Sequence, residues 1–243
     1  MSVTAAIIQA RMGSTRLPGK SVMDIAGKPL IWHVVKRVSR AKLLDGVVIA
    51  IPEEKESPDI LAATQDLKIP VLIMPGDPND LLARYNSAAS LFGISTIVRV
   101  PADNPCVDPD EIDRIINVYR MGMYNSSGGT GQWLTSNLDR NLLANGYPGG
   151  LGAEVYDAWF MHWMSTNVED IELREHPHKW AIEKGRVRTV ECPPQFRRPE
   201  LRFDVNTQED LEYIRSIYNG VYEENQDFRA KDIIEYLDNR RLN

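Results

Sequence analysis

The chain has 243 residues and a formal net charge of −6, with 43% apolar and 26% charged residues. This composition excludes a mostly disordered chain, and the length suits one large α/β domain or two small ones. No apolar run approaches the ~20 residues that cross a bilayer, and residues 3–10 are too short and lack the basic flank of a signal peptide. Cys106 and Cys192 have no metal or redox spacing. We therefore expect a cytoplasmic protein with free thiols.

The charge is distributed unevenly along the chain. Residues 1–42 carry eight Lys or Arg against one acid, Asp24, so their net charge is +7 and the rest of the chain carries −13. A basic start of this kind predicts an anionic partner, such as nucleic acid, a membrane surface or phosphates. Because the chain beyond residue 42 is acidic, a nucleic-acid surface is not favoured. We expect neither nucleic acid nor a membrane as partner.

Apolar runs alternate with segments of helical spacing through the first half of the chain. Residues 3–10 are nearly all apolar, which is typical of a strand buried in a parallel sheet, and residues 29–41 have helical spacing after Pro29. The alternation predicts a mostly parallel α/β sheet with right-handed crossovers. Its further expected elements are strands 46–51, 70–74 and 95–100, helices 59–67 and 110–119, and helix 80–92, which ends at Gly93.

The pattern changes after Met121. Residues 125–131 are typical of a polar loop, and glycines recur within residues 146–152. The absence of repeats and long linkers predicts one domain over residues 1–243, with residues 122–185 as an inserted lid and acceptor-side region. The remaining expected elements are helices 157–165 and 232–237, strands 186–192 and 201–205, and a helix that Thr207 caps with Asp210.

The loop at residues 11–20 follows the first strand, where open α/β sheets bind their ligands. It lacks the glycine spacing of Walker loops and of dinucleotide-binding loops. Arg11, Arg16 and Lys20 lie among two glycines and two hydroxyls, which are the groups that a triphosphate requires. The alternative is a solvated basic turn.

Residues 6–20 (AIIQARMGSTRLPGK) and 27–30 (GKPL) resemble the opening of the cytidylyltransferases that make CMP-activated sugar acids. The resemblance is closest to the branch named for spore-coat polysaccharide biosynthesis, and the Kdo and acylneuraminate enzymes are similar. Weaker matches cover nearly the whole chain, among them residues 76–85 and 98–105. The resemblance implies a single Rossmann-like, glycosyltransferase-A-like nucleotidyltransferase domain that transfers CMP from CTP to a 2-keto-3-deoxy sugar acid, with Mg²⁺ and release of pyrophosphate, for a surface polysaccharide or glycoconjugate.

The same resemblance assigns the nucleotide side of the site. Arg11, Arg16, Lys20 and Asp103 would be the catalytic residues, because transfer at phosphorus depends on charge neutralisation and alignment. Arg84 would contact the cytosine or the phosphates, although a salt bridge on the helix surface is an equal alternative. The nucleotide-binding set is Ala10, Arg11, Met12, Gly13, Ser14, Lys20, Arg84 and Ala102.

Metal binding is implied for Asp103, which by itself could be a turn residue or a helix cap. Related enzymes carry Asp directly before Thr207, where this chain has Asn206. Asp204 lies two residues earlier and therefore on the same face of an extended strand. Either Asp204 binds the metal, or Asn206 binds it more weakly through its carbonyl; Asp204 could also be a surface carboxylate.

The acceptor side departs from the family pattern. Gly149 and Gly152 stand where acids are usual, and Ala102 replaces a glycine. These changes leave open a phosphorylated or phosphonate acceptor, a loop that has become a flexible turn, and a non-catalytic nucleotide-binding relative. The resemblance implies acceptor contacts for Asn137, Tyr147, Glu154, Arg174 and His176.

Other aromatic and imidazole side chains have more than one interpretation. His176 and His178 could begin a zinc site, but without a cysteine partner an acceptor-contacting or partner-contacting loop is favoured. His33 is expected to be a packing residue. The resemblance implies a homodimer through the inserted region, where Trp159, Trp163 and Met164 would either pack internally or line the contact.

Overall fold

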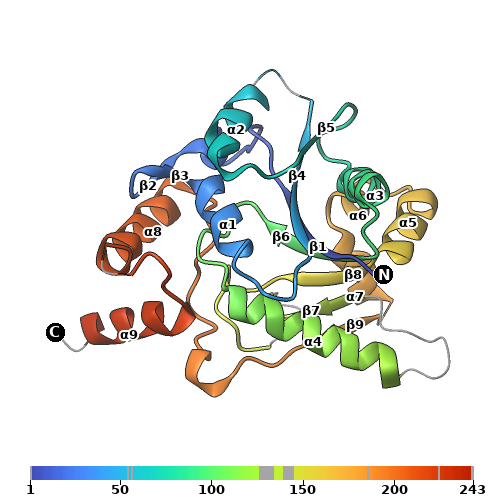
Figure 1. Ribbon diagram of the computed structural model, residues 1–243. Coiled ribbons are helices and arrows are strands. Elements are labelled where there is room, and N and C mark those ends of the chain that lie inside the picture. The colour runs from blue at the N-terminus through green and yellow to red at the C-terminus, as the bar shows by residue number, and fades with distance from the viewer. Residues whose placement is uncertain are drawn as a thin grey trace.

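The computed structural model describes residues 2–53, 55, 57–125, 134–138, 145–184, 186–223 and 225–241. Most of the polar loop expected at residues 125–131 lies outside these residues. A seven-stranded sheet in the order β5-β4-β1-β6-β8-β7-β9 forms the centre (Figure 1). The strands are β1 (Thr4–Gln9), β4 (Gly46–Pro52), β5 (Val71–Met74), β6 (Thr96–Pro101), β7 (Leu134–Ser136), β8 (Glu154–Asp157) and β9 (Val187–Thr189).

The sheet is mostly parallel, as the sequence predicts. β1 pairs in parallel with β4 and β6, β4 with β5, and β7 with β9, whereas β8 runs antiparallel to β6 and β7. The strand expected at residues 201–205 is wrong. In this segment Arg202 forms a single bridge with Gly149, and the amide of Val205 donates to the carbonyl of Asp103 at 2.9 Å. The segment thus connects two loops instead of extending the sheet.

Helices cover both faces of the sheet (Figure 1). One face packs against α1 (Leu30–Val38), α2 (Ser57–Thr64), α4 (Pro109–Asn125), α8 (Gln208–Val221) and α9 (Ala230–Arg241). The other packs against α3 (Leu81–Phe92), α5 (Ala158–Asn167), α6 (Ile171–Glu175) and α7 (Pro177–Glu183). The remaining short elements are the hairpin β2 (Asp24–Ile25) and β3 (Lys28–Pro29), and the 3-10 turns η1 (Lys20–Val22), η2 (Gln65–Leu67) and η3 (Pro194–Phe196).

The helix-end signals in the sequence are confirmed. Thr207 and Asp210 form a reciprocal capping box at the start of α8, and Gly93 ends α3 in the left-handed conformation with φ 64°. The side chain of Asp80 accepts from the amide of Ala83 and so caps α3. No helix in the described part of the chain is long and apolar enough to cross a membrane.

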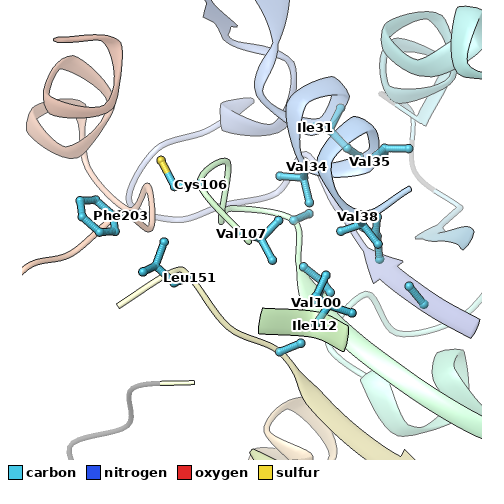
Figure 2. Close-up of a cluster of buried hydrophobic side chains, with 14 of the residues drawn as sticks. Ile31, Val34, Val35, Val38, Val100, Cys106, Val107, Ile112, Leu151 and Phe203 are labelled. Atoms are coloured by element: carbon cyan, nitrogen blue, oxygen red, sulfur yellow. The ribbon is translucent and has the colours of Figure 1, made fainter. Parts of the chain in front are cut away.

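Alternating residues of the central strands feed two hydrophobic clusters. On β1, Ala6 and Ile8 join one cluster and Ala5 and Ile7 the other, which is the period of a strand buried on both faces. Figure 2 shows part of the first cluster, with Val34 and Val38 of α1 and Val100 of β6 on one side of the view and Phe203 on the opposite side, toward Leu151. Each fully buried aliphatic side chain stabilises the fold by about 1.5–3 kcal/mol. The clusters fix the carboxyl ends of β1 and β6 side by side.

Candidate active site

The loop after β1 folds back on itself. The carbonyl of Met12 accepts from the amides of Ser14 at 2.9 Å and Gly19 at 3.0 Å. Gly19 has φ 73°, a conformation that side chains disfavour. Leu17 is buried and anchors the loop in the core, and the hydroxyl of Ser21 donates to the carbonyl of Arg11 at 3.1 Å. The loop is therefore held from several sides while its cations extend from it.

Each loop cation reaches a different segment of the chain. Lys20 Nζ lies 2.7 Å from Asp103 Oδ2, at the end of β6. Arg16 Nη2 donates to Asn206 Oδ1 at 2.7 Å. Arg11 Nη2 donates to Glu175 Oε1 at 2.9 Å. These contacts differ from the alternative of a solvated basic turn, because each cation is held against a partner across the site.

A cavity of about 350 Å³ lies above this loop. Its walls come from the end of β1, the loop itself, α3 and the end of β6. Leu81 and Tyr85 line the cavity from α3, and the cations Arg11 and Lys20 line it from the loop. Its lining includes these residues of the predicted nucleotide set: Ala10, Arg11, Ser14, Lys20 and Ala102.

A second cavity of about 370 Å³ adjoins the first. Its lining includes Gly149 and Gly150 and, adjacent to them, Arg202 and Asp204. The two cavities share part of their walls and therefore lie next to each other. The shared residues are Arg16, Arg99, Pro101, Asp103, His176 and Asn206.

Three predicted nucleotide-binding residues do not line the first cavity: Met12, Gly13 and Arg84. Met12 and Gly13 are part of the loop, and Met12 O holds its turn. Arg84 is buried, so it is not a surface ion-pair residue. Its Nη2 donates to the carbonyls of Asp77 and Pro78, both at 3.1 Å, and adjacent Asn79 contacts Arg11. Arg84 thus holds the turn whose Asn79 contacts Arg11.

The candidate metal ligands lie close together. Asp103 is not a cap of α4, because Asp108 accepts from the amide of Asp110 at 2.8 Å at that helix start. Asp204 accepts from Arg202 Nη2 at 2.6 Å and from Asn206 Nδ2 at 2.5 Å, so Asp204 and Asn206 are adjacent, as the sequence predicts. The described residues contain no cluster of three His, Cys, Asp or Glu side chains that could hold a metal.

This donor set is compatible with a hard cation that takes most of its ligands from elsewhere. Asp103 and Asp204 supply two carboxylates in the wall of the second cavity, and Asn206 supplies an amide. Mg²⁺ is usually bound by one or two carboxylates together with substrate phosphates and water. The site therefore suits a cation that binds together with a triphosphate.

Of the predicted acceptor residues, His176 lines both cavities. The other four lie behind the lining. Asn137 Oδ1 accepts from the amide of Ala153 at 2.8 Å, Tyr147 Oη bonds to Glu111, and Arg174 Nη2 donates to Asp80 at 2.8 Å. The remaining one, Glu154, is completely buried and accepts from Arg99 Nη1 at 2.5 Å.

The two glycines that replace acids have different surroundings. A Cβ on Gly152 would lie 2.4 Å from Asn137 Oδ1 and 2.6 Å from the Asn137 carbonyl oxygen. A Cβ on Gly149 would lie 3.2 Å from Asp204 Oδ1. Gly149 also donates to the carbonyl of Leu201 at 2.9 Å and accepts from the amide of Phe203 at 2.7 Å. This loop is therefore paired with the segment at residues 201–203, unlike the flexible turn considered from the sequence.

Several cavity residues were not singled out from the sequence. Arg99 lines both cavities, and Gln9, Tyr85 and Glu175 line the first. A signal for Arg99 was present, because it is a charge inside the apolar run of β6. Glu175 lies between Arg174 and His176, to which the resemblance assigns acceptor contacts, but it carried no assignment of its own. Gln9 is the last residue of β1, and as a single polar residue at the end of an apolar run it gave no separate signal.

The remaining candidates are resolved by burial. His33 is buried, its Nε2 lies 2.6 Å from the Ile25 carbonyl oxygen, and burial lowers its pKa to about 4, so it is a packing residue.

The rings of His176 and His178 lie 5.9 Å apart. Met164 is buried and the Trp163 ring packs 5.2 Å from Trp180, in keeping with internal packing. Trp159, in contrast, is 63% exposed.

These features define a class of protein. A mostly parallel sheet, a basic glycine-containing loop after β1 and a carboxylate, Asp103, after the end of the neighbouring strand β6 are the parts of an α/β nucleotidyltransferase. A family model described as cytidylyltransferase matches residues 5–145, which is more than half of the chain. The chain belongs to the cytidylyltransferase family, and the resemblance noted in the sequence is confirmed.

Individual relatives support the assignment. The spore coat polysaccharide biosynthesis protein SpsF of Bacillus subtilis (strain 168) is 31% identical over 244 residues, covering 95% of this chain and 92% of that protein. A 3-deoxy-manno-octulosonate cytidylyltransferase of Geobacter sulfurreducens is 39% identical over 116 residues, covering 48% and 44%. The solved structure of a cytidylyltransferase from Leptospira borgpetersenii has a TM-score of 0.86 at 23% identity and covers 100% of this chain and 96% of that chain. The chain is thus a CTP-dependent nucleotidyltransferase.

Proposed function

We propose that this cytidylyltransferase transfers CMP from CTP to a sugar acid of the 2-keto-3-deoxy type and releases pyrophosphate. The observation that carries the proposal is the pair of adjoining cavities with a shared wall of Arg16, Asp103 and Asn206. The cationic loop lines the first cavity and suits a triphosphate. His176, His178 and Arg202 line the second, which suits an anionic, hydroxyl-rich acceptor.

The residues of the chain perform the transfer by neutralising charge and aligning the reactants. An acceptor oxygen attacks the α-phosphorus, and the bond from this phosphorus to the pyrophosphate oxygen breaks. Arg11, Arg16 and Lys20 extend toward the first cavity and are placed to neutralise the triphosphate and the leaving pyrophosphate. The shared wall lets the acceptor approach from the second cavity, so the two reactants meet in the correct orientation.

We further propose that Mg²⁺ is the cofactor, held by Asp103 together with either Asp204 or Asn206. When bound, Mg²⁺ supplies charge neutralisation at the phosphate oxygens. Lys20 pairs with Asp103, and Arg16 and Arg202 contact Asn206 and Asp204. These side chains exchange partners when substrate and cofactor bind, since the cations then face phosphate oxygens.

The proposed reaction is tested by pyrophosphate release. The enzyme is assayed with each of the four nucleoside triphosphates and Mg²⁺ against 2-keto-3-deoxy sugar acids, neutral sugars and phosphorylated small molecules. Release that needs CTP and a sugar acid supports the proposal. Turnover of neutral or phosphorylated acceptors only contradicts it.

A phosphorylated or phosphonate acceptor is the second candidate. It is favoured by Arg202, whose side chain is 64% exposed at the second cavity, and by Gly149, which leaves that wall without an acid. A phosphate carries more negative charge than a carboxylate, so it is favoured by a wall that has the cation Arg202 and no acid at position 149. The same assay separates the two acceptor classes directly.

We also propose a single domain over residues 1–243, in which residues 122–185 form the acceptor side and the contact of a homodimer. In support, β7 and β8 join the main sheet, and His176 reaches both cavities. Trp159 on α5 and Leu91 on α3 are 63% and 65% exposed, and these two helices pack together. Light scattering that gives the mass of one chain contradicts the dimer. Action in the cytoplasm, where CTP is available, is tested by cell fractionation.

A further inference from the structure

Arg99 is a cation built into the wall that the two cavities share. It lies on β6, where it pairs with Ile7 of β1 on one side and with Glu154 of β8 on the other. The residue is only 7% exposed, yet it lines both cavities. Its backbone is fixed by strands on both sides, unlike that of Arg16 in the exposed part of the loop. Arg99 is therefore preorganised at the place where the reactants meet.

Glu154 and the hydroxyl of Tyr85, which also bonds to Arg99, use only part of the bonding capacity of the guanidinium. Arg99 Nη1 donates to Glu154 Oε2 at 2.5 Å, and Tyr156 donates to the same oxygen at 3.1 Å. Burial alone would lower the pKa of Arg99, but Glu154 raises it above its usual value, so the guanidinium stays charged. The buried Nε of Arg99 has no hydrogen-bond partner among the described residues. A guanidinium has several N–H donors, so further donors remain for an anion.

The fold does not require a charge at this position. Ile97 lies on the same face of β6 and packs in an apolar cluster. A buried ion pair is often no more stabilising than apolar side chains of similar volume, because both charges lose their hydration. The Arg99–Glu154 pair is therefore better explained by a ligand than by stability.

The chemistry of the proposed acceptor places an anion at the shared wall. In the cyclic form of a 2-keto acid, the carbon that carries the attacking hydroxyl also carries the carboxylate. When this hydroxyl reaches the α-phosphorus, the carboxylate lies beside the phosphate, and the two negative charges repel. A fixed cation at this point reduces the repulsion without reorganisation during the reaction.

We propose that Arg99 binds the carboxylate of the acceptor at the junction of the two cavities and so selects acids over neutral sugars. The inference rests on the proposed function. The other anion at the junction is the α-phosphate of CTP, and the experiment separates these two ligands because only one of them belongs to the acceptor.

The test compares the wild type with the double variant Arg99→Met/Glu154→Gln, which removes both buried charges together. Two quantities are measured: the Kd of CTP by calorimetry without acceptor, and the ratio of kcat/KM for a sugar acid to that for its C1 amide. We expect this ratio to fall by about 100-fold, since a charge-assisted hydrogen bond is lost. The Kd of CTP should stay within about 3-fold of the wild-type value, because in this proposal Arg99 does not contact the triphosphate.

Single substitutions distinguish a loss of acceptor binding from a loss of the fold. Glu154→Gln keeps the cation and should keep the preference for the acid, whereas Arg99→Lys keeps the charge without the planar fork and should give an intermediate ratio. Equal losses with the acid and the amide indicate a purely structural role and overturn the inference. A large rise in the Kd of CTP assigns Arg99 to the α-phosphate and also overturns it.

The failure of the proposed function is recognised separately in the wild type. If the wild type turns over no sugar acid and uses a neutral or phosphorylated acceptor, the proposed function is wrong, and the inference with it. If the wild type uses a sugar acid and the double variant retains the full preference for it, the proposed function stands and the role of Arg99 alone is wrong.

Discussion

Lys20 and Asp103 form an ion pair in the wall of the first cavity, with 2.7 Å between Nζ and Oδ2. The same Nζ donates to the carbonyl of Val205 at 2.7 Å. One ammonium group thus joins the loop after β1, the end of β6 and the segment before α8. Since Asp103 is a proposed metal ligand, Lys20 competes with the metal for its carboxylate until a triphosphate supplies other oxygens to the ammonium group.

Removal of the Lys20 charge should separate metal binding from turnover. In Lys20→Met, the affinity of the protein for Mn²⁺ without CTP should rise by about 10-fold, because the competing cation beside Asp103 is gone. The kcat/KM should fall by about 10²–10³-fold, because the triphosphate loses a charge contact. Calorimetry with Mn²⁺ and a pyrophosphate-release assay measure the two effects.

The matched control is Lys28→Met, whose ammonium pairs with Asp66 on the surface, away from both cavities. It should leave Mn²⁺ binding and turnover unchanged. A lower Mn²⁺ affinity in Lys20→Met would show that the lysine supports the site instead of competing for it.

Asp204, not Asn206, should complete the metal site. The amide oxygen of Asn206 already accepts from Arg16 and its amide nitrogen donates to Asp204, and a neutral amide binds a hard cation more weakly than a carboxylate does. Asp204→Ala should therefore reduce Mn²⁺ affinity and turnover by about 100-fold or more, and Asn206→Ala by less than about 10-fold. Calorimetry and steady-state kinetics on both variants decide between them, and the reverse order assigns the ligand to Asn206.

Asp103→Ala is expected to abolish turnover, with a loss of at least about 10³-fold in kcat, because the metal then loses its carboxylate at the end of β6. CTP binding in EDTA, which the loop cations still support, checks that the variant is folded. Activity close to that of the wild type would remove Asp103 from the metal site.

The sequence predicts the sheet well because its signals are local. The apolar run of β1, the cap at Thr207 and the end at Gly93 each depend on neighbouring residues, and all three are found in the structure. β7 and β8 were missed because they have three and four residues and are stabilised by pairing with distant strands. Pairing between strands that are distant in the chain is not visible in a local sequence pattern.

The same distinction applies to the site. The loop cations were found because they cluster in ten residues, and their family motif is continuous. The pairing of Arg99 with Glu154 joins residues 55 positions apart, so neither the burial of the pair nor its place in the cavity wall is visible in the chain. The spacing of Asp204 and Asn206 did indicate that their side chains lie together, and Asn206 Nδ2 donates to Asp204 Oδ2 at 2.5 Å.

Gly149 and Gly152 should respond differently to the same substitution. Gly152→Ala should lower the free energy of unfolding by about 3 kcal/mol, because its Cβ would meet the Asn137 backbone at 2.6 Å. Gly149→Ala should cost less than about 1 kcal/mol, because the nearest atom is a carboxylate oxygen of Asp204 at 3.2 Å, which can move. Urea unfolding measures both. Equal stabilities of the two variants would show that the Asn137 backbone moves to accommodate the added Cβ and would contradict this prediction.

His33 sits in an apolar and cationic environment. Its ring lies 4.6 Å from that of Tyr218, and its Nε2 lies 2.6 Å from the Ile25 carbonyl oxygen. Burial lowers its pKa from 6.5 to about 4; the bond to Ile25 opposes this, and the charge of Arg37 adds to it. The native state therefore keeps His33 neutral where the unfolded chain already binds a proton.

This difference predicts a pH-dependent stability. Above pH 6.5 both states hold a neutral His33, and between pH 6.5 and 4 only the unfolded state gains the proton, so folding loses up to about 3 kcal/mol from this group as the pH falls. His33→Gln, which does not titrate, should show a smaller loss over this range. The exposed His162→Gln serves as the control and should behave like the wild type. Urea unfolding at pH 7, 6, 5 and 4 checks this, and equal slopes for the wild type and His33→Gln would contradict the assignment.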